Sequence, residues 1–293
     1  MAMVRMDDAG AARLVVHADS RLEEQVRSLC GQRMVFFAGL PGTGKSLLVH
    51  QLAHLAGGTG RSIHLLQWDV ARPVFEASPA GRRHPLADGV THAIIRKAAG
   101  LWVRHALVRW NERHPEPEHL LAGETPFVGN RFVELAHRLD DRAEALLAAP
   151  SCRFVVAVPS AEVRRFLEAE RERRAASPLH PREREDAPPP VLRDQWRDLV
   201  EVARRLRITA PGAGYDPVVY RRVYEAVLRH RNVDVVALDV ILPTERLSVY
   251  DFAVAPPDLV PTEAEAEEFI REVERGYPDP TVLEREIAHW WEV

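Results

Sequence analysis

The chain contains little cysteine and no long hydrophobic run. Its two cysteines, Cys30 and Cys152, match no metal-binding spacing and offer no disulfide framework, which favours a reducing compartment. No apolar stretch approaches the roughly 18 residues that cross a bilayer, and the N-terminus lacks the apolar core of a signal peptide. We therefore expect a soluble cytoplasmic protein with no membrane partner.

An excess of positive charge is also absent. The formal net charge is −4, so the chain as a whole does not attract nucleic acid or anionic lipid, and a basic site must be local. Only Lys45 and Lys97 are lysines among the 39 basic residues. At 293 residues the chain can form one α/β domain with an insertion or two small domains, and we favour the single domain.

The most informative segment is glycine-rich and covers residues 39–46. It matches the phosphate-binding pattern G-x-x-x-x-G-K-[ST] at every fixed position, and a chance match is on the order of 10⁻³. An apolar run at 34–38 predicts a buried strand before it, and residues 46–56 have the apolar spacing of a helix after it. The alternative is a glycine turn that only joins a strand to a helix.

Each residue type in this segment suits a nucleotide. Glycines allow backbone N–H groups to turn toward phosphate oxygens at a helix N-terminus. Lys45 would reach the β- and γ-phosphates, and the Ser46 hydroxyl would hold Mg²⁺. The residues expected to bind ATP are Gly39, Pro41, Gly42, Thr43, Gly44, Lys45, Ser46 and Leu47.

Carboxylates follow other predicted strands. A strand at 62–68 ends at Asp69, and the apolar run 119–123 leads to Glu124. Residues just beyond the carboxyl ends of parallel strands line the ligand crevice, so Asp69 is a candidate catalytic base and Glu124 a candidate partner of Ser46 at Mg²⁺. Asp239, in a strand predicted at 233–242, competes for the metal role. Asp69 could instead only cap or start the next turn, and Glu124 could only start a turn.

Arginine dominates a helical segment after a fourth predicted strand at 153–158. Helices at 161–176 and 191–206 flank a proline-rich stretch, and the whole segment 160–207 is either a lid that closes on the nucleotide or a solvated hairpin. Arg171 and Arg174 are the candidate catalytic arginines of the lid.

Residues on the substrate side are predicted from the segments between these strands. A surface loop is expected at 71–88, a long helix with buried Trp102 and Trp110 at 90–113, and another helix at 130–148. The candidate substrate-binding residues are Arg72, Arg82, Arg83 and Arg131.

Strands that alternate with helices predict a three-layer α/β fold around about five parallel strands. We expect a main domain at 1–250, with the lid at 160–207 and the substrate-side segment at 71–114. Prolines and an acidic helix suggest a C-terminal helical appendage at 251–293.

In the order of these features the chain resembles P-loop kinases of the nucleoside and nucleotide kinase group, and above all deoxynucleoside kinases. Asp69 is similar to the acidic base of that family, and residues 170–174 are similar to its arginine-rich lid. Glu124 and Arg131 resemble its Glu-Arg-Ser-x-x-x-x-Arg segment, although Thr125 and Pro126 replace the family's arginine and serine.

The resemblance implies the P-loop NTPase fold and ATP- and Mg²⁺-dependent phosphoryl transfer to a small hydroxyl- or phosphate-bearing metabolite, such as a nucleoside or nucleotide. A homodimer is the assembly to test. The main alternative is an NTPase switch or chaperone that acts on a protein partner. A kinase that acts on nucleic-acid ends is disfavoured, because tracking a phosphate backbone needs a basic surface.

Overall fold

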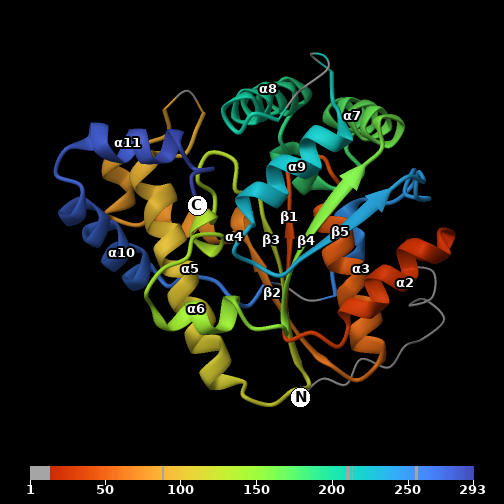
Figure 1. Ribbon diagram of the computed structural model, residues 1–293, viewed down its shortest axis with the longest axis horizontal. Coiled ribbons are helices and arrows are strands. Elements are labelled where there is room, and N and C mark those ends of the chain that lie inside the picture. Colours follow the sequence, from red (N-terminus) through yellow and green to blue (C-terminus); the bar gives the residue numbers. More distant parts are fainter. Residues whose placement is uncertain (1–13, 88, 209–211, 213, 255–256) are drawn as a thin grey trace.

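A single parallel sheet organises the protein. The structure, a computed structural model, describes residues 14–87, 89–208, 212, 214–254 and 257–293. The sheet has five strands in the order β2-β3-β1-β4-β5 (Figure 1). The strands are β1 (Met34–Ala38), β2 (Ser62–Gln67), β3 (His119–Thr125), β4 (Cys152–Pro159) and β5 (Val233–Leu238). The predicted α/β class and the parallel sheet are confirmed.

Helices cover both faces of the sheet and give three layers. On one face, Val35 and Phe37 of β1 pack against α2 (Ser20–Leu29) and α3 (Lys45–Gly58). On the other face, Phe36 packs in a cluster with α4 (Trp68–Ala77), α5 (Ala93–Arg113) and α9 (Pro217–Val227). The alternation follows from the two-residue period of a strand, which sends successive side chains to opposite faces.

The remaining helices extend these layers. They are α6 (Arg142–Leu147), α7 (Ala161–Ala176), α8 (Pro189–Arg205), α10 (Glu263–Gly276) and α11 (Pro280–Ala288). Helices α10 and α11 place Phe269, Ile270 and Ile287 in the same hydrophobic cluster as the buried Trp102 and Trp110 of α5. Among the described residues, no helix combines the length and the apolar character that crossing a membrane requires.

The prediction of a loop at 71–88 is wrong for residues 71–77, because residues Trp68–Ala77 form helix α4. Pro73 lies inside this helix and removes one backbone donor, which disfavours a helix by about 3 kcal/mol. Trp68, Ala71 and Phe75 are buried at helical spacing, and the area that the two aromatic side chains bury outweighs that penalty. As a result, Asp69 stands in the first turn of a helix and not in a loop.

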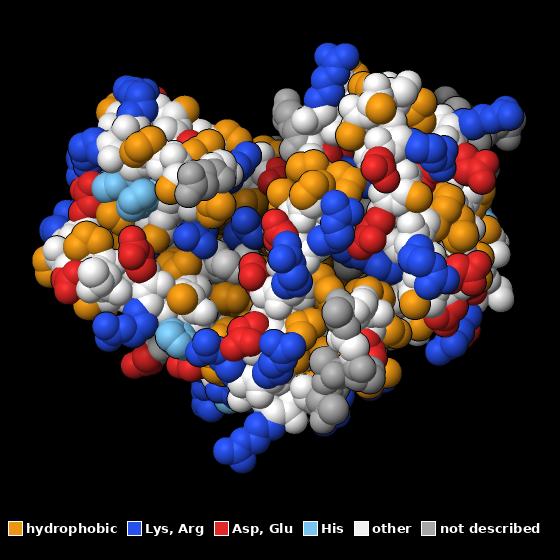
Figure 2. All heavy atoms as spheres, turned by 90° about the horizontal axis from the view of Figure 1, so that it is seen from above, with side chains coloured by type: hydrophobic (Ala, Val, Ile, Leu, Met, Phe, Trp, Pro, Cys, Tyr) orange, Lys and Arg blue, Asp and Glu red, His pale blue; other side chains and the backbone are white. Residues whose placement is uncertain are grey.

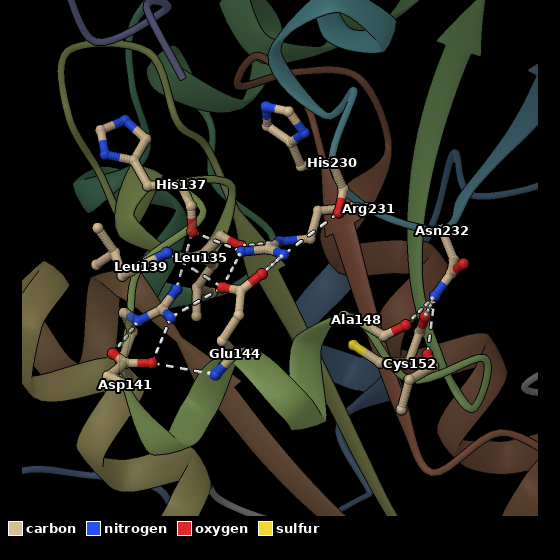
Figure 3. A network of polar contacts seen from close by, with 12 residues as sticks. Leu135, His137, Leu139, Asp141, Glu144, Ala148, Cys152, His230, Arg231 and Asn232 are labelled. Atoms are coloured by element: carbon tan, nitrogen blue, oxygen red, sulfur yellow. Dashed lines mark hydrogen bonds and ion pairs between the residues drawn. The ribbon is translucent and has the colours of Figure 1, made fainter.

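The prediction of one continuous helix at 130–148 is also largely wrong. Only the short 3₁₀-helix η3 (Val133–Leu135) and helix α6 form there. Two buried arginines bind the carbonyl groups that a continuous helix would use internally (Figure 3). Arg104 donates to the carbonyls of Glu134 and His137, and Arg231 donates to those of Leu135 and His137. Both guanidinium groups also contact the carboxylate of Glu144.

Candidate functional site

The glycine-rich loop 39–46 joins the central strand β1 to helix α3. Gly39, Gly42 and Gly44 have φ angles of 150°, 69° and 85°, which residues with a side chain adopt rarely. Space is a second constraint at Gly39, because an added Cβ would lie 2.1 Å from the Tyr220 hydroxyl oxygen. The conformation of this loop therefore depends on glycine for both backbone and packing reasons.

A hydroxyl and a carboxylate meet at the start of α3. The β1–β3 register places Glu124 beside Phe37, one residue before the end of β1. The Ser46 hydroxyl donates a 2.7 Å hydrogen bond to Glu124 Oε2 across 78 residues of sequence. Burial raises the pKa of the Glu124 carboxyl and the nearby Asp69 raises it further, whereas Lys45 lowers it.

Lys45 is almost completely buried beside this pair. Its Nζ donates to the Leu40 carbonyl at 2.8 Å, within the same loop. Burial lowers the pKa of the Lys45 ammonium to about 8, against the opposing effect of the Glu124 and Asp69 carboxylates. The loop thus places a buried ammonium group next to two carboxylates.

The chain is in a rare conformation after β3, where it carries Arg131. Phe127, Asn130 and Phe132 all have φ angles near +60°, and Phe127 and Arg131 pair through backbone hydrogen bonds of 3.0 and 3.2 Å. Such backbone costs about 1–3 kcal/mol per residue and is typical of functional sites. The turn brings Arg131 close enough to Asp69 and Arg72 for their charges to affect its pKa.

The α7–α8 hairpin lies against the loop, above the carboxyl ends of the strands in Figure 1. Arg164 of α7 is buried and donates to the carbonyls of Pro41 and Gly42 at 3.0 and 3.1 Å. Leu192 of α8 covers Gly42. Arg171 forms an ion pair with Asp186 and is close enough to Lys45 to affect its pKa. Sequence reasoning did not single out Arg164, because it resembles any other arginine of an arginine-rich helix.

Three predicted site arginines contact other parts of the molecule. Arg174 bonds Glu183 and the carbonyls of Thr244 and Leu247, so it holds the segment after β5 against α7. Arg83 donates to the Glu274 carboxylate of α10 at 2.8 and 2.9 Å, and Arg82 donates to the Ala77 carbonyl. None of the contacts described for these arginines reaches the loop 39–46.

Comparison with known proteins does not extend this description. The chain matches no family model, no curated protein and no solved structure.

A cavity of 620 Å³ lies beside the turn that carries Arg131. It is bounded by α8, the start of α5 and the C-terminal helix, and the residues nearest the turn are Val128, Gly129, Arg96 and Asp198. Figure 2, which looks down on the strand ends, shows the surface hollowed between the α10–α11 side and the α7–α8 side. The candidate substrate-binding residues Arg82 and Arg83 do not line this cavity, which opens between α8 and α11.

Together these groups suit the handling of a phosphorylated ligand. Backbone N–H groups at a helix N-terminus and a buried ammonium bind anionic oxygens. The Ser46 hydroxyl and the Glu124 carboxylate offer the oxygen ligands that Mg²⁺ prefers. Asp69 is exposed and close to both Lys45 and Arg131, which leaves it accessible to a second substrate.

Proposed function

We propose that the protein is an ATP- and Mg²⁺-dependent phosphotransferase that acts on a small hydroxyl- or phosphate-bearing metabolite, such as a nucleoside or nucleotide. The observation that carries the proposal is the 2.7 Å contact between Ser46 and Glu124 beside the buried Lys45. A strand–loop–helix turn needs none of these three groups. A site that binds a metal–triphosphate complex needs a hydroxyl, a carboxylate and an ammonium together.

Each group of the site has a separate role in the proposed reaction. The amides of the loop 39–46 and Lys45 bind the β- and γ-phosphates, while Ser46 and Glu124 hold Mg²⁺ directly or through water. When bound, Mg²⁺ neutralises part of the phosphate charge. Asp69 accepts the proton of the acceptor hydroxyl while the oxygen of that hydroxyl forms a bond to the γ-phosphorus of ATP. The bond between the γ-phosphorus and the β–γ bridging oxygen breaks, and ADP is released. Arg171 faces the charge that develops on the transferred group.

The acceptor occupies the cavity beside Arg131. The turn at 127–132 lines this cavity with Val128 and Gly129, and it also carries Arg131, which lies near Asp69 and Arg72. Arg72 and Arg131 orient the acceptor, and the α7–α8 hairpin acts as the lid that keeps water from the reacting groups. Two cationic side chains at this corner favour an acceptor that already carries a negative group.

The test is phosphate transfer from ATP with Mg²⁺ to a panel of nucleosides, nucleotides and small hydroxyl compounds, followed by phosphorus NMR. We expect transfer to at least one acceptor at a rate well above hydrolysis. Glu124→Gln should lower kcat by about 100-fold or more, because a metal ligand is lost. Asp239→Asn is the matched control, since Asp239 is exposed beyond β5, and it should stay within a few-fold of the wild type.

Other outcomes separate the alternatives. Tight nucleotide binding without transfer to any acceptor would contradict the proposal, and slow hydrolysis with a partner that binds one nucleotide state would support a switch or chaperone. Failure to bind any nucleotide would contradict both the phosphotransferase proposal and the alternative of a nucleotide-dependent switch or chaperone.

A further inference from the structure

Three histidines meet near the start of strand β3: two are five positions apart in the sequence, and the third comes from the neighbouring strand β2. His64 lies in β2, His114 is the C-cap residue of α5, and His119 is the first residue of β3. One ring nitrogen of each histidine lies within 4.8 Å of one ring nitrogen of each of the other two. Among the described residues, these histidines are the one group of three or more histidine, cysteine or carboxylate side chains that lie close enough together to hold a metal ion. It takes no part in the function proposed above.

The spacing of the rings suits a single ion. His64 Nε2 and His119 Nδ1 are 2.9 Å apart, and the His114 ring centroid lies 4.3 and 4.6 Å from those of His64 and His119. Nitrogens bound to one tetrahedral Zn²⁺ are about 3.3 Å apart, from Zn–N bonds of about 2.0–2.1 Å. Small rotations of the rings would therefore give three nitrogen ligands to one ion.

One carboxylate is hydrogen-bonded to the outer nitrogen of His64, and a second lies near the outer nitrogen of His119. Asp258 Oδ2 is 2.5 Å from His64 Nδ1, and Glu116 Oε2 is 3.7 Å from His119 Nε2. Asp258 also accepts the backbone N–H of Leu65, which fixes its position. A carboxylate on the outer nitrogen sets the tautomer of a metal-binding histidine and increases the basicity of the inner nitrogen.

The backbone around His119 is held in place by two arginines. Arg33 donates to the carbonyls of Glu116 and His119, both at 2.8 Å. Arg61 donates to the carbonyls of Pro117 and His119 at 2.9 and 3.0 Å. A cavity of 90 Å³ lined by His114 and Asp258 lies alongside, with room for a water molecule.

We propose that His64, His114 and His119 form a site for one divalent transition-metal ion of the Zn²⁺ type, with water as the fourth ligand and Asp258 as a positioning residue. Neutral imidazoles suit Zn²⁺, whereas Mg²⁺ prefers oxygen ligands. The ion joins β2, the end of α5 and the start of β3, and Asp258 attaches the segment before α10. Its main effect is to stabilise this edge of the fold.

The test uses the full chain without a histidine tag, stripped with EDTA and dialysed against Zn²⁺ in the presence of excess Mg²⁺. We expect about one Zn²⁺ per chain and a higher unfolding temperature when Zn²⁺ is bound. Co²⁺ in place of Zn²⁺ should give the strong visible absorption of a four-coordinate ion. Neither result depends on nucleotide binding, so the failure of this proposal and of the phosphotransferase proposal can be told apart.

Variants locate the ion. His114→Gln and His119→Gln should each weaken Zn²⁺ binding about 100-fold or more, and Asp258→Asn about 10- to 100-fold. The controls are His105→Gln, an exposed histidine of the same helix α5, and Cys30→Ser, which removes a half-buried thiol. Both controls should bind Zn²⁺ as the wild type does.

Two results would overturn the proposal. One is a wild type that binds no Zn²⁺ after stripping. The other is equal Zn²⁺ affinity in the wild type and in His114→Gln, with circular dichroism showing that the variant is folded. His114 lies at the end of a helix and outside the sheet, so its replacement disturbs the fold least of the three.

Discussion

Replacing Glu144 by glutamine tests whether the two buried arginines hold the segment after β3 in its irregular path. Arg231 is fully buried and Arg104 is 1% exposed, and both donate to the Glu144 carboxylate. Glutamine has nearly the same shape but loses the negative charge and turns N–H groups toward guanidinium donors. Removing one partner of a buried ion pair costs about 3–5 kcal/mol.

The expected loss is smaller than this range. Glu144 is 21% exposed, Arg104 keeps its bonds to Asp141, and Arg231 keeps the carbonyls of Leu135 and His137. We therefore expect Glu144→Gln to lower the free energy of unfolding by about 2–3 kcal/mol, or the unfolding temperature by roughly 4–6 °C. Urea unfolding followed by circular dichroism measures the change.

The matched control is Glu112→Gln, which breaks an ion pair between Glu112 and Arg142 whose side chains are 50% and 77% exposed. It should cost less than about 0.5 kcal/mol. If Glu144→Gln destabilises the protein no more than this control, the network does not support the fold as argued.

The same network predicts a pH dependence. Burial raises the pKa of Glu144, but the hydrogen bonds from Arg231 and Arg104 and the charge of Arg231 outweigh it and lower the pKa from its ordinary value of 4.5 to about 2. A pKa that is lower in the folded state stabilises the protein above pH 4.5, and this stabilisation is lost as the pH falls toward 2. The difference in stability between the wild type and Glu144→Gln should therefore shrink over that window, and a constant difference would contradict the assignment.

Two further predictions concern glycines. Gly100→Ala should destabilise the protein by about 2–4 kcal/mol in urea unfolding, because the new Cβ would lie 1.7 Å from the Oε2 of the buried Glu134. The control is Gly57→Ala in α3, whose Cβ meets no atom within 4 Å and which should be neutral or stabilising by up to about 1 kcal/mol. Equal effects of the two substitutions would contradict this prediction. Gly39→Ala should cost about 2–3 kcal/mol, and Tyr220→Phe in the same chain should recover at least about 1 kcal/mol, because the hydroxyl oxygen lies 2.1 Å from the new Cβ and the ring carbon Cζ lies 3.4 Å from it. A double-mutant cycle with no coupling energy would show that backbone strain alone requires glycine at this position.

Local sequence patterns determined the elements that carry the glycine-rich loop. The apolar run at 34–38, the glycines after it and the apolar spacing that follows predicted β1, the loop and α3. The helix predicted at 161–176 has the same range in the structure, where the Ser160 side chain caps its N-terminus. Such features depend on backbone preferences and on interactions within a few residues, so they can be read from the sequence alone.

Only the tertiary structure decided the elements whose stability comes from distant partners. Helix α4 forms in spite of Pro73 because Trp68 and Phe75 are buried against other helices. The segment 126–141 stays irregular because Arg104 and Arg231, from α5 and from the residues before β5, bind its carbonyls.

The two lysines and the three histidines show the same difference between what the sequence predicts and what only the tertiary structure decides. The sequence predicted a role for Lys45, but it did not predict that Lys97 would pair with the buried Glu134 and with Glu286 of α11. His114 and His119 are five positions apart in the sequence, but His64 joins them only because β2 pairs with β3. Residue types and short-range spacing therefore determined the glycine-rich loop between β1 and α3, whereas long-range packing decided which arginine contacts that loop and where His64 meets the other two histidines. The physical reason is that Arg164 and Pro41, like His64 and His119, are dozens of positions apart, and no local pattern records such contacts.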